Sequence, residues 1–235
     1  KTTATTIYKK QKLDRDHIVD IVDLDVVAFV KMEMRLMLNE EIARAILIGD
    51  GRQITDDDKI PEENIRPVYT DDDLYAHKVT VAADVTPSGL VKSIIRARKH
   101  YKGKGMPNLY TTTDVVTDML LEEDKVGRRI YSTMEALKAA LRVNDIVEVP
   151  VMEGVSREVD GNDLDLVAIL LNPRDYVAGA DKGGEINLFD DFDIDYNQYK
   201  YLMETRMSGA LKDPKTAIVI EKARAAEETP VDPEP

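Results

Sequence analysis

The 235-residue chain contains no cysteine, only three histidines and no long apolar run. Without cysteine it can have no disulfide framework, no thiolate chemistry and no cysteine-type zinc site. The histidines, His17, His77 and His100, are scattered along the sequence. No apolar segment is long enough to span a bilayer, so we expect no membrane partner.

Positive charge is also scarce. Lysine and arginine number 32 against 45 aspartates and glutamates, which gives a formal net charge of -13. Such a chain repels phosphate backbones over most of its surface, and this argues against a protein whose main task is gripping nucleic acid. Hydrophobic residues make up 43% of the chain, which is enough to bury a core in one or two globular domains.

Motifs for catalysis and for cofactor binding are missing as well. No serine lies in a nucleophile-elbow motif. Gly103-Lys104-Gly105 lacks the spacing of a phosphate-binding loop. We therefore predict that the protein is not an enzyme and that it needs no cofactor.

One acidic stretch imitates a calcium-binding loop. Every second residue of the segment 191–197 is Asp or Asn, as at the start of such a loop. However, Tyr196 stands where glycine is required, and Leu202 stands where a bidentate glutamate belongs. A solvated turn is the better interpretation, and a calcium-dependent binding module stays open as an alternative. The aspartate triplets at 56–58 and 71–73 are also better explained as hydrated loops, so we assign no metal site.

The main positive feature is a long stretch of helical periodicity. Apolar residues recur at helical spacing between Asp23 and Gly51, which predicts one helix over residues 24–49. Asp23 or Asp25 can cap its start, and Gly49 or Gly51 can take the left-handed conformation that ends it. About 25 residues give a rod of roughly 37 Å, where the average helix has about 11–12 residues. Such a rod is either an ordinary core helix or the frame of an assembly.

The rest of the chain alternates short strands and helices, which predicts an α+β fold after an extended arm at residues 2–12. Ser132, with Glu135 three residues on, has the capping-box pattern of a helix start. The tail from Ala223 to Pro235 lacks periodicity, and we expect it to be disordered. We expect strands at 77–83, 109–112, 146–152, 164–171, 185–189, 199–207 and 216–221, and helices at 90–101, 113–123 and 132–141.

One basic cluster interrupts the acidic sequence. Six lysines and arginines lie between positions 92 and 104, and they include Arg96, Lys99 and Lys102. They could touch nucleic acid or an acidic neighbouring subunit. In so acidic a chain, the acidic neighbour is the better interpretation.

The order of these parts resembles a known family. The long helix contains Met34-Arg35-Leu36-Met37-Leu38-Asn39-Glu40-Glu41 and ends at Gly49-Asp50-Gly51. A central α+β region follows, and then a strand pair closed by Pro214 and Thr216-Ala217-Ile218-Val219-Ile220. From about Ile7 to Lys222 the chain looks like the major capsid protein of tailed bacteriophages, which has the Hong Kong 97-like fold.

The resemblance implies a division into domains. Residues 1–22 would be a strand and the remnant of an extended loop. Residues 23–83 and 185–222 would form the peripheral domain, with its β-sheet and with 24–49 as the spine helix. Residues 84–184 would form an α+β axial domain, and 223–235 the tail. In comparison with the family pattern, this sequence lacks the N-terminal arm and half or more of the extended loop. Because Lys1 also begins the chain without an initiator Met, we expect a processed or truncated protein.

The resemblance also implies a function. The chain would self-assemble, as pentamers and hexamers, into an icosahedral shell that encloses double-stranded DNA in the virion of a phage or prophage. Assembly would take place in the cytoplasm of the bacterial host, and scaffold, protease and portal proteins would be its partners. An encapsulin-type nanocompartment shell is the alternative. The candidate subunit-contact residues are Arg96, Lys99 and Lys102 of the basic cluster and Lys31 and Arg35 of the spine helix.

Some members of this family weld their shells with isopeptide bonds between a loop lysine and a peripheral-domain asparagine, assisted by a glutamate. Asn197 and Glu204 lie where this asparagine and glutamate would lie. The alternative is that Asn197 is a turn residue and that Glu204 forms an ion pair with Lys200 or Arg206. We prefer this alternative. The donor lysine stays open among Lys1, Lys9, Lys10 and Lys12.

Overall fold

A computed structural model describes residues 2–15, 25–181 and 184–224 of the chain. The chain divides into two compact units, each made of two segments. The first unit takes Lys1–Asp71 and Tyr176–Lys212, and the second takes Asp72–Asp175 and Asp213–Pro235. None of the described helices is both long and apolar enough to cross a membrane.

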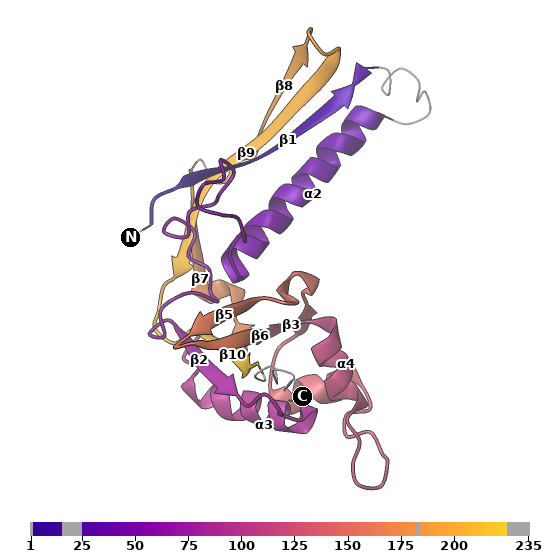
Figure 1. The fold of residues 1–235 in the computed structure, drawn as a ribbon, viewed down its shortest axis with the longest axis vertical. Helices are drawn as coiled ribbons and strands as arrows, with labels where there is room; N and C mark the ends of the chain where they lie inside the picture. The colour runs from indigo at the N-terminus through magenta and orange to yellow at the C-terminus, as the bar shows by residue number, and fades with distance from the viewer. Residues whose placement is uncertain (1, 16–24, 182–183, 225–235) are drawn as a thin grey trace, which may run out of the picture. The chain divides into compact units, whose positions relative to one another are not determined.

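The first unit contains a four-stranded antiparallel sheet built around one long strand, β9 (Gln198–Leu211). Strand β1 (Thr5–Asp14) pairs along one edge of β9. Two strands share the other edge, β8 (Asn187–Asp193) beside the first half of β9 and β7 (Tyr176–Ala180) beside the second half. Figure 1 shows β8, β9 and β1 side by side, with helix α2 along them.

Helix α2 (Val26–Leu47) confirms the predicted long helix. Its 22 residues give a length of about 33 Å. The Asp25 carboxylate caps the start, accepting a hydrogen bond from the Ala28 N–H at 3.0 Å. Gly49 and Gly51, just beyond the end, both have positive φ angles, 91° and 70°. Asp25 is thus the cap of α2, and both predicted glycines take the left-handed conformation. Asp23, the other predicted cap, lies outside the described residues.

One face of α2 packs on the sheet. Met34, Leu38 and Ala45 are buried on this face and meet the inward side chains of β1 and β9. Along β9 those inward side chains are alternate residues, because successive side chains of a strand point to opposite faces. The core of the first unit is completed by two residues that follow the helix. Its buried members are Ile7, Met34, Leu38, Ala45, Ile60, Ile65, Tyr201, Met203 and Met207.

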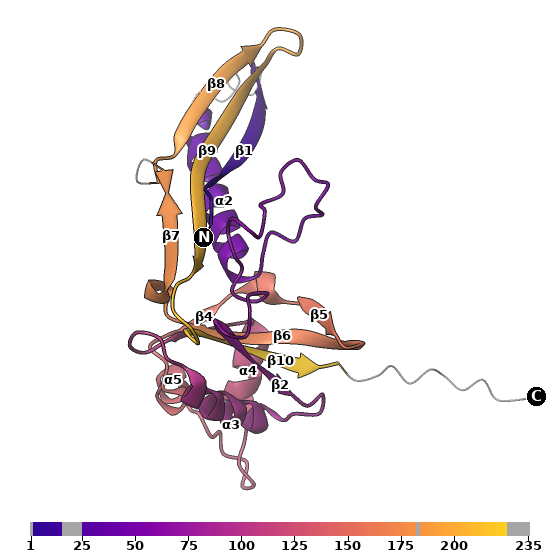
Figure 2. The ribbon, with the colours of Figure 1, turned by 90° about the vertical axis from the view of Figure 1, so that its left-hand side faces the viewer.

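The second unit contains a mixed six-stranded sheet. The strand order is β2-β10-β6-β3-β4, with β5 paired to β6 outside this path. The pairs β2–β10 and β3–β4 are parallel, and the others are antiparallel. Figure 2 shows β2, β6 and β10 running side by side. The strands are β2 (Ala76–Val81), β3 (Asn108–Thr111), β4 (Ile146–Glu148), β5 (Ser156–Val159), β6 (Asn162–Leu171) and β10 (Ala217–Ala223).

Three helices pack on this sheet around the second core. They are α3 (Pro87–Ala97), α4 (Thr113–Leu121) and α5 (Met134–Leu141). The Thr86 hydroxyl caps α3 by accepting a hydrogen bond from the Gly89 N–H at 3.1 Å. Leu90, Ile94 and Ala97 form the buried apolar face of α3, and Ile95 is partly exposed. Fully buried core residues include Ile94, Leu109, Met119, Leu137, Leu141, Leu170, Ile218 and Ile220.

The observed division of the chain differs from the predicted boundaries. Residues 76–81 and 217–223 form β2 and β10, which pair with each other and not with the sheet of the first unit. Strand β10 also pairs with β6, so hydrogen bonding places the segment 213–223 in the second unit. Conversely, β7 pairs with β9 and belongs to the first unit. Pairings between residues so far apart in the sequence leave no local signal.

Three local predictions also need correction. The cap of α5 is Thr133, whose hydroxyl accepts a hydrogen bond from the Ala136 N–H at 3.2 Å, and not Ser132. The strand predicted over 146–152 ends at Glu148, and Pro150, which has no N–H to donate to a ladder, begins a 3₁₀ turn. The predicted tail begins too early, because Ala223 is the last residue of β10. The remainder of the predicted tail beyond Arg224 lies outside the described residues.

Leu38 and Leu36 provide a matched test of this packing on one helix. Leu38 is fully buried against the sheet, whereas Leu36 is 52% exposed. Leu38→Ala should lower the free energy of unfolding by about 2–5 kcal/mol, because it leaves a cavity in the first core. Leu36→Ala should change it by less than about 0.5 kcal/mol. Urea unfolding followed by circular dichroism measures both, and equal losses would contradict the assigned face of α2.

Candidate functional site

The predicted basic cluster forms an exposed surface on α3 and the segment after it. The exposed side chains of Lys92 and Arg96 are four residues apart, so they lie on one face of α3, and exposed Lys99 follows three residues later in the 3₁₀ turn Arg98–His100. The opposite face carries the buried apolar residues. Lys102 is also exposed and follows the 3₁₀ turn Arg98–His100. The structure therefore brings Arg96 and Lys99 together.

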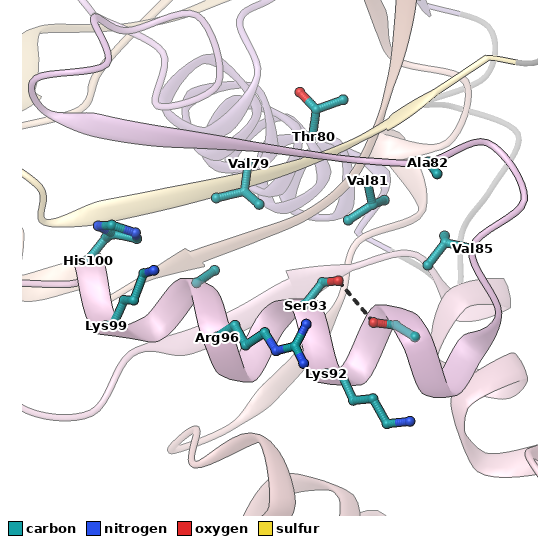
Figure 3. A pocket seen from close by; sticks show the side chains of 12 residues that line it. Val79, Thr80, Val81, Ala82, Val85, Lys92, Ser93, Arg96, Lys99 and His100 are labelled. Carbon is teal, nitrogen blue, oxygen red and sulfur yellow. Dashed lines mark hydrogen bonds between the residues drawn. The ribbon is translucent and has the colours of Figure 1, made fainter.

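A groove lies between this face of α3 and strand β2 (Figure 3). Its volume is about 530 Å³. Val79, Val81 and Val85 give it an apolar side, and the α3 cations lie on the other side. The hydroxyl of Ser93 also lines the groove, and it donates a hydrogen bond to the Gly89 carbonyl at 3.0 Å. The groove therefore offers apolar surface and positive charge side by side.

Two histidines meet at one end of the groove. The rings of His77 and His100 lie 4.4 Å apart between centroids, and the Nδ1 atom of His77 is 3.3 Å from a carboxylate oxygen of Asp73. Burial lowers the pKa of His100, and the nearby charges of His77 and Lys99 lower it further. His100 is therefore harder to protonate than a fully solvated histidine. No three acidic or histidine side chains of the described residues are placed to hold a metal ion.

The two candidate residues of α2 have different environments. Lys31 is half-buried, and its ammonium lies 5.5 Å from the centroid of the Tyr201 ring, within the same unit. Arg35 is exposed. Three apolar side chains of α2, Phe29, Met32 and Leu36, are also 49%, 63% and 52% exposed. The helix is thus apolar on the face that packs against the sheet and on part of its outer surface.

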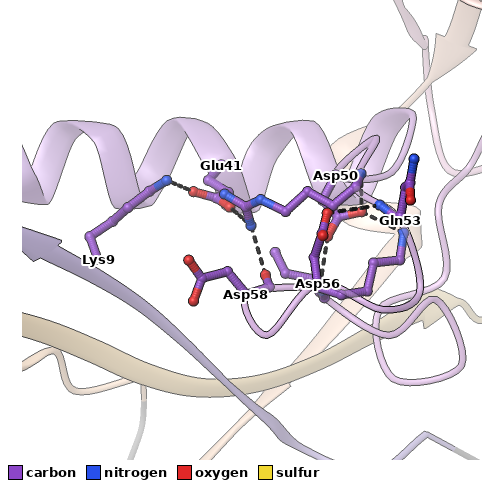
Figure 4. Close-up of polar contacts among 9 residues, drawn as sticks. Lys9, Glu41, Asp50, Gln53, Asp56 and Asp58 are labelled. Carbon is purple, nitrogen blue, oxygen red and sulfur yellow. Dashed lines mark hydrogen bonds and ion pairs between the residues drawn. The ribbon is translucent and has the colours of Figure 1, made fainter.

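A polar network joins the end of α2 to the loop that follows it (Figure 4). The Glu41 carboxylate forms ion pairs with Lys9 of β1 and with Arg52 of the loop. The Arg52 guanidinium also donates to the Asp58 carbonyl at 2.7 Å. In the same loop, Asp56 accepts a hydrogen bond from the backbone of Gln53. Within the aspartate triplet 56–58, the Asp56 side chain and the Asp58 carbonyl thus stabilise their own loop, and Asp57 is exposed.

Asp50 is the buried centre of this loop. Its carboxylate accepts hydrogen bonds from the Lys59 ammonium at 2.6 Å, the Ile60 N–H at 2.7 Å and the Arg52 N–H at 3.2 Å. Burial alone would raise the pKa of Asp50, but these donors together lower it below the ordinary value of 3.8. The sequence signal for this role was limited to the position of Asp50 between two glycines.

The segment 191–197, which imitates the start of a calcium loop, ends β8 and forms the turn before β9. The Asp193 carboxylate forms an ion pair with Lys200 at 2.5 Å and accepts a hydrogen bond from the Asp195 N–H at 3.3 Å. Asn197 has a φ angle of 52°, and its carbonyl accepts a hydrogen bond from the Arg15 N–H. Asn197 thus lies in the turn between β8 and β9.

Glu204 differs from its prediction. Among the described residues, Lys200 forms its ion pair with Asp193, and Arg206 forms one with Asp181 at 3.6 Å, so neither cation pairs with Glu204. Glu204 is half-buried on β9, opposite Tyr8 of β1 and Asn187 of β8. Asn197 immediately precedes β9, and the strand between them spans about 20 Å. One chain therefore does not bring Asn197 and Glu204 together.

The candidate donor lysines for an isopeptide cross-link also differ in their surroundings. Lys9 is held by Glu41, whereas Lys10 and Lys12 stand opposite Leu202 and Lys200 on the β1–β9 ladder. Lys10 lies over the ring of Tyr8, at 4.6 Å from its centroid. Lys1 lies outside the described residues.

The fold is similar to that of solved capsid structures. The capsid of an empty GTA particle matches with a TM-score of 0.62 and 12% identity, over 93% of this chain and 72% of that one. The capsid of Myoviridae phage XM1 matches with a TM-score of 0.61 and 10% identity, over 95% and 74%. A virus-like particle from Pyrococcus furiosus matches with a TM-score of 0.59 and 14% identity, over 92% and 76%. The chain has the fold of phage capsid proteins.

Comparison of sequences alone does not find this likeness. No protein-family model matches the sequence, and a search of curated proteins finds no match either.

The Asp50 network predicts a specific pH dependence of stability. Because the folded pKa of Asp50 is lowered, its contribution is complete above the ordinary value of 3.8 and is lost as the pH falls through the folded pKa. Asp50→Asn should lower the free energy of unfolding at pH 7 by about 1–3 kcal/mol. The gap to wild type should shrink below about pH 4.

Urea titrations between pH 3 and pH 7 measure this gap. Asp57→Asn is the control, since Asp57 is an exposed residue of the same loop and should change stability by less than about 0.5 kcal/mol. A gap that stays constant over the whole pH range would contradict the role of the Asp50 carboxylate.

Proposed function

We propose that this chain is the structural major capsid protein of a tailed bacteriophage or prophage and that it has the Hong Kong 97-like form of the capsid fold. The observation that carries the proposal is the match of 92–95% of the chain to solved capsid and virus-like particle structures. Copies of the chain would form pentamers and hexamers of an icosahedral shell around double-stranded DNA. The role is structural and not enzymatic.

The two compact units fit the two domains of this proposal. The first unit, with α2 and the sheet around β9, would be the peripheral domain, and α2 would be its spine helix. The second unit, with its six-stranded sheet and three helices, would be the axial domain. The proposed boundaries follow the observed units, so β2 and β10 belong to the axial domain.

Shell contacts would come from surfaces that the chain leaves uncovered. Arg96, Lys99 and Lys102 would meet an acidic surface of a neighbouring copy, and Arg35 would add a contact from the spine helix. Lys31 contributes less, because it packs on Tyr201 of its own sheet. A closed shell repeats each contact many times, so individually weak contacts suffice. The net charge of -13 would keep packaged DNA from adhering to the inner wall.

The remaining partners follow from the same proposal. Scaffold, protease and portal proteins would act during assembly in the host cytoplasm, and the finished chain would reside in the virion. An encapsulin-type nanocompartment would use the same kind of shell but enclose protein cargo. The contents of purified particles separate the two functions.

Electron microscopy tests the proposed function directly. The full-length product, purified from an expressing bacterium, should form closed shells of uniform diameter in negative stain. Nuclease-protected double-stranded DNA should accompany shells that assemble in an infected or induced host. Protein cargo in place of DNA would support the nanocompartment. A product that stays monomeric at every concentration, even with its neighbouring genes expressed, would contradict a shell-forming role.

Asn197 and Glu204 generate a second prediction. Because they are about 20 Å apart along β9, we expect shells without a covalent weld at Asn197. Denaturing gels of assembled particles should show only monomer-sized bands, and Asn197→Asp should leave the pattern unchanged. Higher bands that disappear in Asn197→Asp, but persist in the hairpin control Asn187→Asp, would instead demonstrate an isopeptide bond at Asn197.

A further inference from the structure

Strand β2 lies at the edge of the second sheet. In the described part of the chain it pairs with β10 alone, so its other edge has no strand beside it. Alternate residues of such an edge turn their backbone N–H and C=O groups outward, where an added strand can bind them. In the first half of β2 two outward N–H groups have partners within the chain, because Ala76 donates to the Asp72 carbonyl and Lys78 donates to the Asp73 carboxylate, both at 2.9 Å. The second half, around Thr80, is the part of this edge to which a strand can add. Thr80, in the second half of β2, is exposed.

The residues that line the groove beside β2 determine which side chains an added strand would need. Val79, Val81 and Val85 give it an apolar side, while Lys92 and Arg96 of α3 and Lys99 of the 3₁₀ turn also line it (Figure 3). Among the described residues, none of these three cations forms an ion pair. A strand that carries apolar and acidic side chains on the same face would satisfy both sides of the groove at once.

Strand β8 of the first unit has this pattern. It is also an edge strand, since its described partner is β9 alone. Leu188 and Asp190 share one of its faces, and Phe189 and Asp191 share the other. All four side chains are exposed, Leu188 at 39% and Phe189 at 52%. Whichever face turns toward α3, β8 therefore presents an apolar residue and an acid two positions apart.

The acids of β8 are also available for a contact. The neighbouring Asp193 is engaged with Lys200, but within the described ranges neither Asp190 nor Asp191 has an ion pair. The sheet edge, the apolar residues and the charges of β8 thus each complement those of the β2–α3 groove.

We propose that β8 of one copy adds to the second half of the β2 edge, around Thr80, in a second copy and extends its six-stranded sheet. Asp190 or Asp191 then faces Lys92, Arg96 and Lys99, and Leu188 or Phe189 covers the valines of the groove. The contact is head to tail, because each copy offers one β2 edge and one β8 edge, and a repeated contact of this kind forms a ring where the rotation between copies closes. This inference rests on the proposed shell function and names the acidic neighbour of the basic cluster.

A charge exchange tests the pairing. Arg96→Glu with Lys99→Glu should weaken association of the full chain more than tenfold, and Asp190→Lys with Asp191→Lys should do the same. Combining all four substitutions in one chain should restore most of the association, since the opposite charges meet again. Analytical ultracentrifugation measures the oligomers. Asp57→Lys with Glu63→Lys is the control, because it makes the same change of charge at exposed acids outside β8.

Cross-linking provides an independent test, and the absence of cysteine makes it free of background. Thr80→Cys combined with Phe189→Cys, treated with a short bis-maleimide, should give a ladder of dimers, trimers and longer chains on denaturing gels. Each single variant should stop at the dimer or remain monomeric, because a ladder needs two reactive sites in every copy.

The outcomes separate this contact from the proposed function. If the wild-type chain never associates, the shell function fails. If it assembles but the charge exchange restores nothing and no ladder forms, the β8–β2 contact is wrong. A cross-linked band of monomer mass would place the contact within one chain and overturn the proposal. Loss of nucleic-acid binding in Arg96→Glu with Lys99→Glu, with assembly unchanged, would assign the groove to nucleic acid and overturn it too.

Discussion

The alternation of side chains along β9 is the constraint on which the first unit depends. Tyr201, Met203 and Met207 turn to one side and are buried under α2, whereas Lys200 and Arg206 turn to the other. A shift of one residue in the pairing of β9 with β1 would exchange these sets and place charges in the core. The register therefore fixes which face of α2 is covered, and thereby which of its side chains stay exposed.

Polar contacts then fix the loop that ends the helix. Glu41 connects α2 to β1 through Lys9 and to the loop through Arg52. Asp50 gathers three donors within the loop, with its carboxylate removed from water. Together these two acids fix β1, α2 and the loop after α2 relative to one another, which non-directional apolar packing alone would not do.

The sequence predicts elements whose signals are local. The periodicity of α2, its cap at Asp25 and its glycine end are all readable, because each depends on neighbouring residues. The alternation of β9 and the apolar run of β6 are readable for the same reason. The partners of β10 cannot be predicted in this way, because the strands β6 and β2 that pair with it lie about 50 and 140 positions earlier in the chain. The predicted domain boundaries fail at this point.

The interaction surfaces, too, include features that the sequence predicts and features that it does not. The exposed position of Arg96 and Lys99 follows from their spacing opposite the apolar residues of α3. The groove does not follow from residue spacing, because it depends on β2 lying beside α3 at the edge of the sheet, with no further strand paired to β2 in the described residues. Proximity in sequence predicts Lys200 or Arg206 as the partner of Glu204, but these cations pair with Asp193 of the neighbouring strand β8 and with Asp181, which directly follows the neighbouring strand β7.

The ladder between β1 and β9 has a mechanical consequence. It joins ten antiparallel residue pairs, from Thr5 opposite Met207 to Asp14 opposite Gln198. Tension applied along β1 acts on these rungs in shear, so all of them share the load instead of opening one after another. Force transmitted through β1 is thus spread along most of β9, and from β9 into the core beneath α2.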